Sequence, residues 1–179
     1  DLALHGEWVY VAAGDAGLTP HHRLATVLPG GSATASALLA LVGTVTLMPL
    51  NPGAQPSALA DQIAAAGADA ALLPAGPLGE SLAAILEDRG LKDRGVTVLR
   101  WDTAAPPALV GGPVSAPNTA RAPGLVLHTS GSTGRPKRVP LTPDQLLLSA
   151  RNIATHLALG PDDRVAHALP LFHVGAIVD

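Results

Sequence analysis

The first hundred residues alternate between apolar helical patterns, each closed by a glycine, and short apolar runs typical of buried strands. Glycine readily adopts the left-handed backbone conformation in which many helices end, so it marks where each helix stops. Alternation of helix and strand favours a parallel sheet covered by helices, because each helix carries the chain back to the edge where the next strand begins. We therefore predict an α/β fold of layered, mostly parallel sheets flanked by helices. The expected helices span residues 32–42, 56–66 and 81–89, and the expected strands span residues 44–49, 68–73 and 96–100.

The size of the chain suits one domain, since 47% of its 179 residues are hydrophobic and can form a core. Its only methionine is Met48, and residues 176–179 end the sequence in an apolar, strand-like run. We interpret the chain as an internal piece of a longer polypeptide.

Charge and cysteine content argue against several classes of protein. The formal net charge is −3, and the one dense basic cluster is Arg135, Lys137 and Arg138, whereas nucleic-acid-binding domains are usually basic. Because the chain has no cysteine, it offers no disulfide, no thiolate nucleophile and no cysteine metal site. We expect a cytoplasmic protein with no nucleic-acid partner.

Residues 33–50 carry no charged side chain, a length that also suits a membrane span. Serine, threonine and glycine are frequent there, and Gly43 and Pro49 interrupt the run where a helix would give way to a strand. We therefore expect a buried helix and strand in this region, and no membrane span.

Residues 128–137 combine small hydroxyl side chains, two glycines and two cations in one short run. Glycines let backbone N–H groups approach an anion, hydroxyls donate hydrogen bonds and cations neutralise charge, so the composition suits a polyphosphate. The order of residues argues against a Walker A loop, because that loop needs Gly-Lys-Ser/Thr where this chain has Pro136, Lys137 and Arg138, although a Walker-type phosphotransferase remains an alternative.

The segments around this run have clear local patterns. Residues 125–128 form an apolar strand, and residues 102–122 form a connector rich in proline and glycine. Thr142 and Gln145 form a capping box with Pro143 at the first helical position, so a helix begins there. Its apolar stripe is Leu146, Leu147, Ala150, Ile153, Ala154 and Leu157.

The run from Thr129 to Lys137 resembles the signature loop of the adenylate-forming superfamily, T-S-G-[ST]-T-G-x-P-K-G. This superfamily includes acyl-CoA synthetases, fatty-acid and aryl-acid ligases and the adenylation domains of peptide synthetases. Every fixed position matches except the last, where Arg138 replaces glycine. If the loop needs a small residue there, Arg138 alters how it closes on phosphate; a side chain that points outward would leave it unchanged.

Other segments extend the resemblance in family order from about residue 24 to the end. Residues 28–30 and 48–52 look like the family's early helix start and its P-L-[DN]-P turn, and residues 169–175 look like its L-P-[LM]-F-H-x-x-G segment. Residues 6–10 are similar to the family's opening hairpin. Within the superfamily, the H-T-S-G variant is similar to the oxalate-CoA ligase group, and residues 171–179 also look like carrier-linked adenylation domains.

The resemblance implies the reaction and the site. A carboxylate attacks the α-phosphate of ATP, pyrophosphate leaves, and a thiol then takes the acyl group from the adenylate. The resemblance implies ATP, Mg²⁺ and CoA or phosphopantetheine as cofactors. It implies a small carboxylic acid, and CoA or a carrier protein, as partners. The catalytic residues and most Mg²⁺ ligands are expected beyond this chain. The implied phosphate-binding residues are Thr129, Ser130, Gly131, Ser132, Thr133, Gly134 and Lys137, and the implied acyl-pocket residues are Phe172, His173 and Gly175.

The resulting expectation is a partial N-terminal AMP-binding domain over residues 1–179. Its parts are βα units at 24–101, a connector at 102–123 and, at 124–179, the phosphate-loop strand, loop and helix followed by an acyl-pocket strand. We expect this piece alone to be inactive. A carrier-protein-loading adenylation domain and a non-catalytic nucleotide-binding module remain as alternatives.

Several polar residues have more than one interpretation. His173 either lines the acyl pocket or is a core histidine bonded through one ring nitrogen, and His128 is expected to be structural. His21 and His22 have no acidic or cysteine ligand at metal-binding spacing. Residues 162–163 are two aspartates that we expect to lie in a solvated turn.

Overall fold

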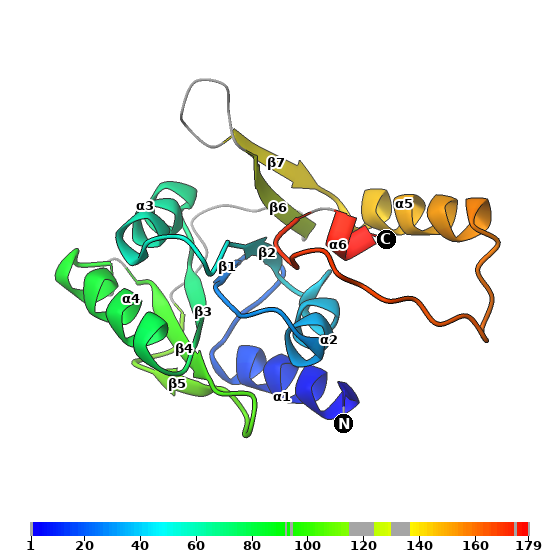
Figure 1. The fold of residues 1–179 in the computed structure, drawn as a ribbon. Coiled ribbons are helices and arrows are strands. Elements are labelled where there is room, and N and C mark those ends of the chain that lie inside the picture. The colour runs from blue at the N-terminus through cyan, green and yellow to red at the C-terminus, as the bar shows by residue number, and fades with distance from the viewer. Residues whose placement is uncertain are drawn as a thin grey trace.

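The computed structural model describes residues 2–91, 93, 95–114, 124–129, 137–173 and 175–178. A seven-stranded sheet forms the centre of the fold, with strand order β5-β4-β3-β1-β2-β6-β7 (Figure 1). Strands β1 to β4 and β6 are parallel, and β5 and β7 pair antiparallel at the two edges. The predicted α/β class with a mostly parallel sheet is therefore confirmed. The strands are β1 (Arg23–Thr26), β2 (Thr46–Pro49), β3 (Ala70–Pro74), β4 (Thr97–Trp101), β5 (Ala108–Val110), β6 (Gly124–Thr129) and β7 (Lys137–Leu141).

Helices cover both faces of this sheet (Figure 1). One core contains residues of α1 and α2, and the other contains residues of α3 and α4. Successive side chains of a strand point to opposite faces, so Leu24 of β1 belongs to the first core and Ala25 to the second. The helices are α1 (Leu2–Asp15), α2 (Ser32–Leu41), α3 (Pro56–Ala66), α4 (Pro77–Asp88), α5 (Pro143–His156) and α6 (Gly175–Val178).

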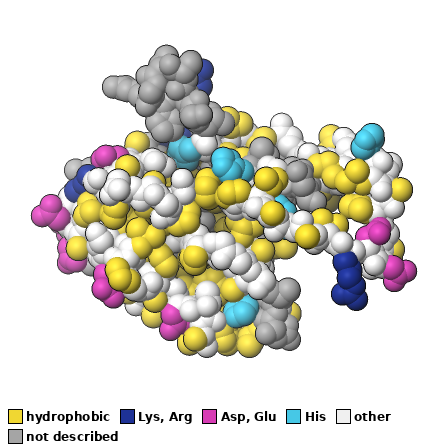
Figure 2. Space-filling view, in the orientation of Figure 1, with side chains coloured by type: hydrophobic (Ala, Val, Ile, Leu, Met, Phe, Trp, Pro, Cys, Tyr) yellow, Lys and Arg dark blue, Asp and Glu magenta, His cyan; other side chains and the backbone are white. Residues whose placement is uncertain are grey.

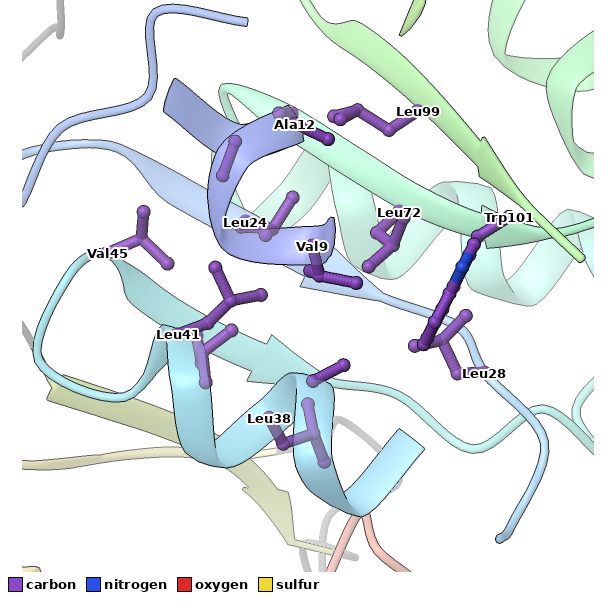
Figure 3. Close-up of a cluster of buried hydrophobic side chains, with 14 of the residues drawn as sticks. Val9, Ala12, Leu24, Leu28, Leu38, Leu41, Val45, Leu72, Leu99 and Trp101 are labelled. Carbon is purple, nitrogen blue, oxygen red and sulfur yellow. The ribbon is translucent and has the colours of Figure 1, made fainter. Parts of the chain in front are cut away.

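Figure 3 shows the first core, where side chains of α1 and α2 meet the strands. Val9 and Leu41 lie against the strand residues Leu24 and Leu72, all of them at most 3% exposed. Trp101 is 2% exposed, and its indole N–H donates to the carbonyl of Ala105 at 2.9 Å, so its one polar group is satisfied.

Local sequence signals explain most helix ends. Helix α3 begins with Pro56 at its first position and ends at Gly67, which has the left-handed φ of 60°. At the start of α5, the Thr142 hydroxyl accepts from the Gln145 N–H at 3.2 Å, and the Gln145 side chain accepts from the Thr142 N–H at 2.9 Å. The predicted capping box is thus confirmed. The predicted apolar stripe of α5 is only partly buried, because Leu146 is buried whereas Leu147 is 50% and Leu157 is 60% exposed.

The uncharged stretch at 33–50 is the buried helix and strand that we expected. Leu38 and Leu41 of α2 and all four residues of β2 are buried. Among the described residues, the helices are too short or too polar to cross a membrane.

Three sequence predictions were wrong. Residues 6–10 lie in α1 rather than in a hairpin, because Val9, Ala12 and Ala13 are spaced to bury one helix face against α2. The connector at 102–123 contains the edge strand β5, and residues 175–178 form the short helix α6 instead of a strand. Strands β1 and β7 were not predicted at all.

Candidate functional site

The β6–β7 hairpin carries the two described ends of the phosphate-binding candidates. Thr129 ends β6 and is paired with Lys137, which begins β7. Leu125 and Leu127 anchor β6 in the core, and both are at most 5% exposed. The hairpin therefore holds the two ends of the signature run side by side. The intervening candidates lie outside the described residues: Ser130, Gly131, Ser132, Thr133 and Gly134.

Close packing of β6 on β7 depends on Gly124. A Cβ atom at this position would lie 2.2 Å from the Leu141 carbonyl oxygen and 3.3 Å from its carbonyl carbon. Only glycine allows so close an approach of two backbones. The register that places Thr129 opposite Lys137 is thus coupled to a glycine at the base of the hairpin.

The hairpin is positively charged on its exposed side. The side chains of Lys137 and Arg138 are exposed, and basic side chains border the top of the molecule in Figure 2. His128, opposite Arg138 in the strand pairing, is half-buried. Burial lowers the pKa of His128 from its ordinary 6.5, and the charge of Arg138 lowers it further. His128 is therefore neutral at pH 7, and Lys137 and Arg138 supply the positive charge here.

The acyl-pocket candidates lie in a different part of the fold, in the segment that leads into α6. The rings of Phe172 and His173 are 4.6 Å apart and tilted by 41°. Phe172 is half-buried, whereas His173 is exposed. The interpretation of His173 as a core histidine is therefore wrong, and its place in a pocket stays a prediction. Gly175 is the first residue of α6.

Phe172 lines a cavity of about 60 Å³ at the carboxyl ends of β1 and β2. The segment after β1 leads to α2 on one face of the sheet, and the segment after β2 leads to α3 on the other. Parallel α/β sheets commonly bind ligands in the crevice where such connections diverge. The lining residues are Thr26, Leu28, Gly30, Thr34, Leu38, Pro49, Leu50, Pro52, Pro170, Leu171 and Phe172.

The wall of this cavity is apolar apart from two threonines. The Thr34 hydroxyl already donates to the Pro29 carbonyl at 2.8 Å, so little hydrogen-bonding capacity points at an occupant. A second, apolar cavity of about 170 Å³ lies between α2 and α6, and Leu38 and Leu171 line both. These walls suit the apolar part of a small ligand better than a charged group.

Other candidates have structural roles. The Asp163 carboxylate accepts from the Gly160 N–H at 2.6 Å, and Asp162 and Asp163 are exposed, which confirms the solvated turn. His22 is buried, and its Nδ1 accepts from the Thr19 N–H at 3.0 Å. In the described part of the chain, no three His, Cys, Asp or Glu side chains gather in a way that could hold a metal ion.

Sequence reasoning missed the wall residues Thr26, Thr34 and Leu38. The available signal was that residues 28–30 follow β1 and residues 48–52 contain the end of β2, because ligand sites in such sheets gather at the carboxyl ends of strands. Because the expected strands do not include β1, the sequence alone does not locate this edge of the sheet.

Comparison with known proteins identifies the class. The family model described as AMP-binding enzyme matches residues 13–179, so the chain belongs to the AMP-binding enzyme family. Among curated relatives, sulfoacetate–CoA ligase of Cupriavidus necator is 35% identical over 170 residues, which cover 91% of this chain and 33% of that protein. Oxalate–CoA ligase of Saccharomyces cerevisiae is 44% identical over 68 residues, covering 37% of this chain and 12% of that protein. The chain thus spans about a third, or less, of the length of these relatives.

Solved structures share the fold. MatB from Rhodopseudomonas palustris, bound to ATP, has a TM-score of 0.76 and 22% identity over 99% of this chain and 36% of its own. O-succinylbenzoate coenzyme A synthetase from Bacillus subtilis, in complex with ATP and magnesium ion, has a TM-score of 0.74 and 21% identity over 99% of this chain and 46% of its own.

Proposed function

We propose that this chain belongs to an ATP-dependent acid–thiol ligase and supplies its phosphate-binding hairpin and part of its acyl pocket. In the first step, a carboxylate oxygen attacks the α-phosphorus of ATP, the bond to the bridging oxygen breaks, and pyrophosphate leaves. In the second, a thiol sulfur attacks the acyl carbon, AMP leaves, and the thiol proton passes to solvent. The observation that carries the proposal is the hairpin that pairs Thr129 with Lys137 at the two ends of the signature run.

The cations of this hairpin fit the first step. Pyrophosphate is a highly charged anion, so groups that bind the β- and γ-phosphates and neutralise their charge lower the barrier to its departure. In this proposal, Lys137 binds those phosphates as an exposed cation, and the rest of the run from Thr129 to Gly134 donates hydrogen bonds to them. Mg²⁺ would be bound by groups outside the described residues.

The apolar cavities support a role in holding the acyl group. Phe172 lines the cavity at the ends of β1 and β2, and Gly175 directly precedes Ala176 and Ile177, which line the cavity beside α2. His173 is exposed next to Phe172, where it can contact the polar end of an acid. We propose all three as acyl-pocket residues. The division at 24–101, 102–123 and 124–179 is also part of the proposal, with β5 inside the connector and α6 at the end of the last part.

CoA is the acyl acceptor we favour. The relative with 35% identity over most of this chain is a CoA ligase. The likeness to a nonribosomal peptide synthetase, with 22% identity and a TM-score of 0.68, supports the fold alone. Mass spectrometry distinguishes the alternatives, because a CoA ligase forms acyl-CoA and a carrier-loading domain acylates a pantetheinylated protein. A cytoplasmic location stays a prediction.

The test is acid-dependent ATP–pyrophosphate exchange by the full-length protein that contains this chain. The acid panel includes short, long and aromatic acids, together with sulfonated and dicarboxylic acids because of the named relatives. We expect exchange with at least one acid, and a loss of about ten- to hundredfold in Lys137→Ala, because a charge-assisted hydrogen bond contributes roughly 1.5–3 kcal/mol. The matched control is Arg151→Ala, which removes an exposed cation from α5.

Absence of exchange with every acid, or equal loss in both variants, contradicts the proposal. The isolated chain of residues 1–179 is expected to show no exchange, since the proposed site lacks a catalytic residue within it. Robust ATP–pyrophosphate exchange by residues 1–179 alone would refute the expectation that this piece is inactive.

A further inference from the structure

Two arginines from distant strands converge on the carboxyl end of α3. Helix α3 has no basic residue in its last turn. The Arg23 guanidinium, from β1, donates to the Ala66 carbonyl, and the Arg138 guanidinium, from β7, donates to the Ala65 carbonyl at 3.2 Å. Arg138 is 73 residues away from Ala65 in sequence.

These contacts give hydrogen-bond donors to carbonyl groups at the end of α3. The last carbonyls of a helix lack partners within it, and that end carries partial negative charge. The Gly67 N–H bonds to the carbonyls of Ala64 and Ile63. The two carbonyls that follow in the chain are the ones that the arginines contact, and a cation there is favoured by both hydrogen bonding and the helix dipole.

The hairpin that carries Arg138 pairs with the rest of the sheet over a short length. In the part of the chain that the structure describes, β6 joins β2 through two residue pairs, Thr46 with Gly124 and Leu47 with Leu125. The outer half of the hairpin, where His128 faces Arg138, therefore extends past the paired segment of β2. The bond from Arg138 to α3 links this outer half to the body of the domain.

We propose that Arg138 is a positioning residue that fixes the outer half of the β6–β7 hairpin on α3. Lys137 is its direct neighbour in β7, so the same contact fixes the backbone from which the proposed phosphate-binding cation extends. The part concerning ATP rests on the proposed function. Arg138 stands where the signature pattern of the family has glycine. Because glycine has no side chain, it could not make this contact with α3.

The first measurement is backbone amide hydrogen exchange in the full-length protein without substrate. We expect the β6–β7 amides to exchange about three- to tenfold faster in Arg138→Ala, because one exposed, charge-assisted hydrogen bond is lost. Arg138→Lys keeps the charge but not the guanidinium, so its exchange should be intermediate. The control Arg151→Ala should match wild type. Unchanged exchange in Arg138→Ala overturns the proposal.

The second measurement separates positioning from general stability. Arg138→Ala should raise the KM for MgATP about three- to tenfold while kcat stays within about twofold, and Arg138→Lys should restore part of the affinity. Equal KM values in Arg138→Ala and wild type overturn the role in ATP binding. If the wild-type protein shows no acid-dependent ATP–pyrophosphate exchange, the proposed function fails. Amide hydrogen exchange and equilibrium ATP binding then still decide the role of Arg138.

Discussion

Replacing Gly124 by alanine tests how closely β6 and β7 are packed. The added Cβ would lie 2.2 Å from the Leu141 carbonyl oxygen, whereas ordinary contacts begin at 3.4 Å. Strand β7 must therefore retreat by about 1 Å, and this retreat weakens the pairing that holds Leu141 beside Leu125. Overpacking of this kind costs roughly 1–3 kcal/mol of unfolding free energy.

The matched control is Gly14→Ala in helix α1. No atom lies within 4 Å of a Cβ at that position. Alanine also restricts the unfolded chain and favours helix, so this variant should be more stable than wild type by about 0.5–1 kcal/mol. The same chemical change is thus expected to have opposite signs at two sites.

Equilibrium urea unfolding of the chain, followed by far-ultraviolet circular dichroism, measures both effects. Gly124→Ala should unfold at a lower urea concentration than wild type, and Gly14→Ala at a higher one, with a difference of about 1.5–4 kcal/mol between them. Coincident midpoints for the two variants would refute the reasoning, since they would mean that β7 does not closely oppose Gly124.

Three further changes test separate features. Burial raises the pKa of Asp69 above its ordinary 3.8, with a smaller opposing effect from His22, so the contribution of Asp69 to stability falls as pH rises from below 3.8 through that raised pKa. The unfolding free energy of Asp69→Asn minus that of wild type should therefore increase as pH rises over this range, and a constant difference would contradict this. Arg138→Gln should raise the pKa of His128 but leave it below 6.5, since burial is the larger cause of the lowered pKa. NMR titration of the imidazole measures this, and an unchanged pKa would exclude the effect of Arg138. Leu38→Ala should cost about 2–5 kcal/mol in urea unfolding, because Leu38 is 5% exposed and separates two cavities; a loss below about 1 kcal/mol would show that the cavities collapse freely.

The parts of the fold that were predictable are those with strong local signals. Helices α2, α3 and α4 end near glycines, and α5 has a complete capping box. Strands β2, β3 and β4 are almost entirely buried, so they appear in the sequence as continuous apolar runs. Local chemistry was sufficient in each case.

The missed elements depend on distant contacts. Helix α1 contains Gly6, where a Cβ would meet the Ser36 hydroxyl at 3.0 Å, so its close approach to α2 is visible only in three dimensions. Strand β7 is mostly exposed and contains Pro140, two properties that indicate a loop in a sequence but suit an edge strand in a sheet. Strand β1 is only four residues long and begins with a charged residue, Arg23.

The same distinction applies to the site. The order of residues in the signature run indicated Thr129 and Lys137 as phosphate-binding candidates, but their pairing requires the unpredicted β7. The segment 169–173 indicated Phe172, but its cavity forms only when that segment folds back on the ends of β1 and β2. Sequence patterns thus proposed the chemical groups, and tertiary contacts determined which of them meet.

The division of the interior by the sheet has a consequence for how this protein can change. Leu24 and Leu41 belong to the core beside α1 and α2, and Leu59 belongs to the core beside α3 and α4. Substitutions at Leu24 and Leu41 can compensate each other through shared space, whereas those at Leu24 and Leu59 should add independently. The two layers can therefore diverge separately, and the helices that border the proposed acyl cavity can be remodelled without repacking those on the other side.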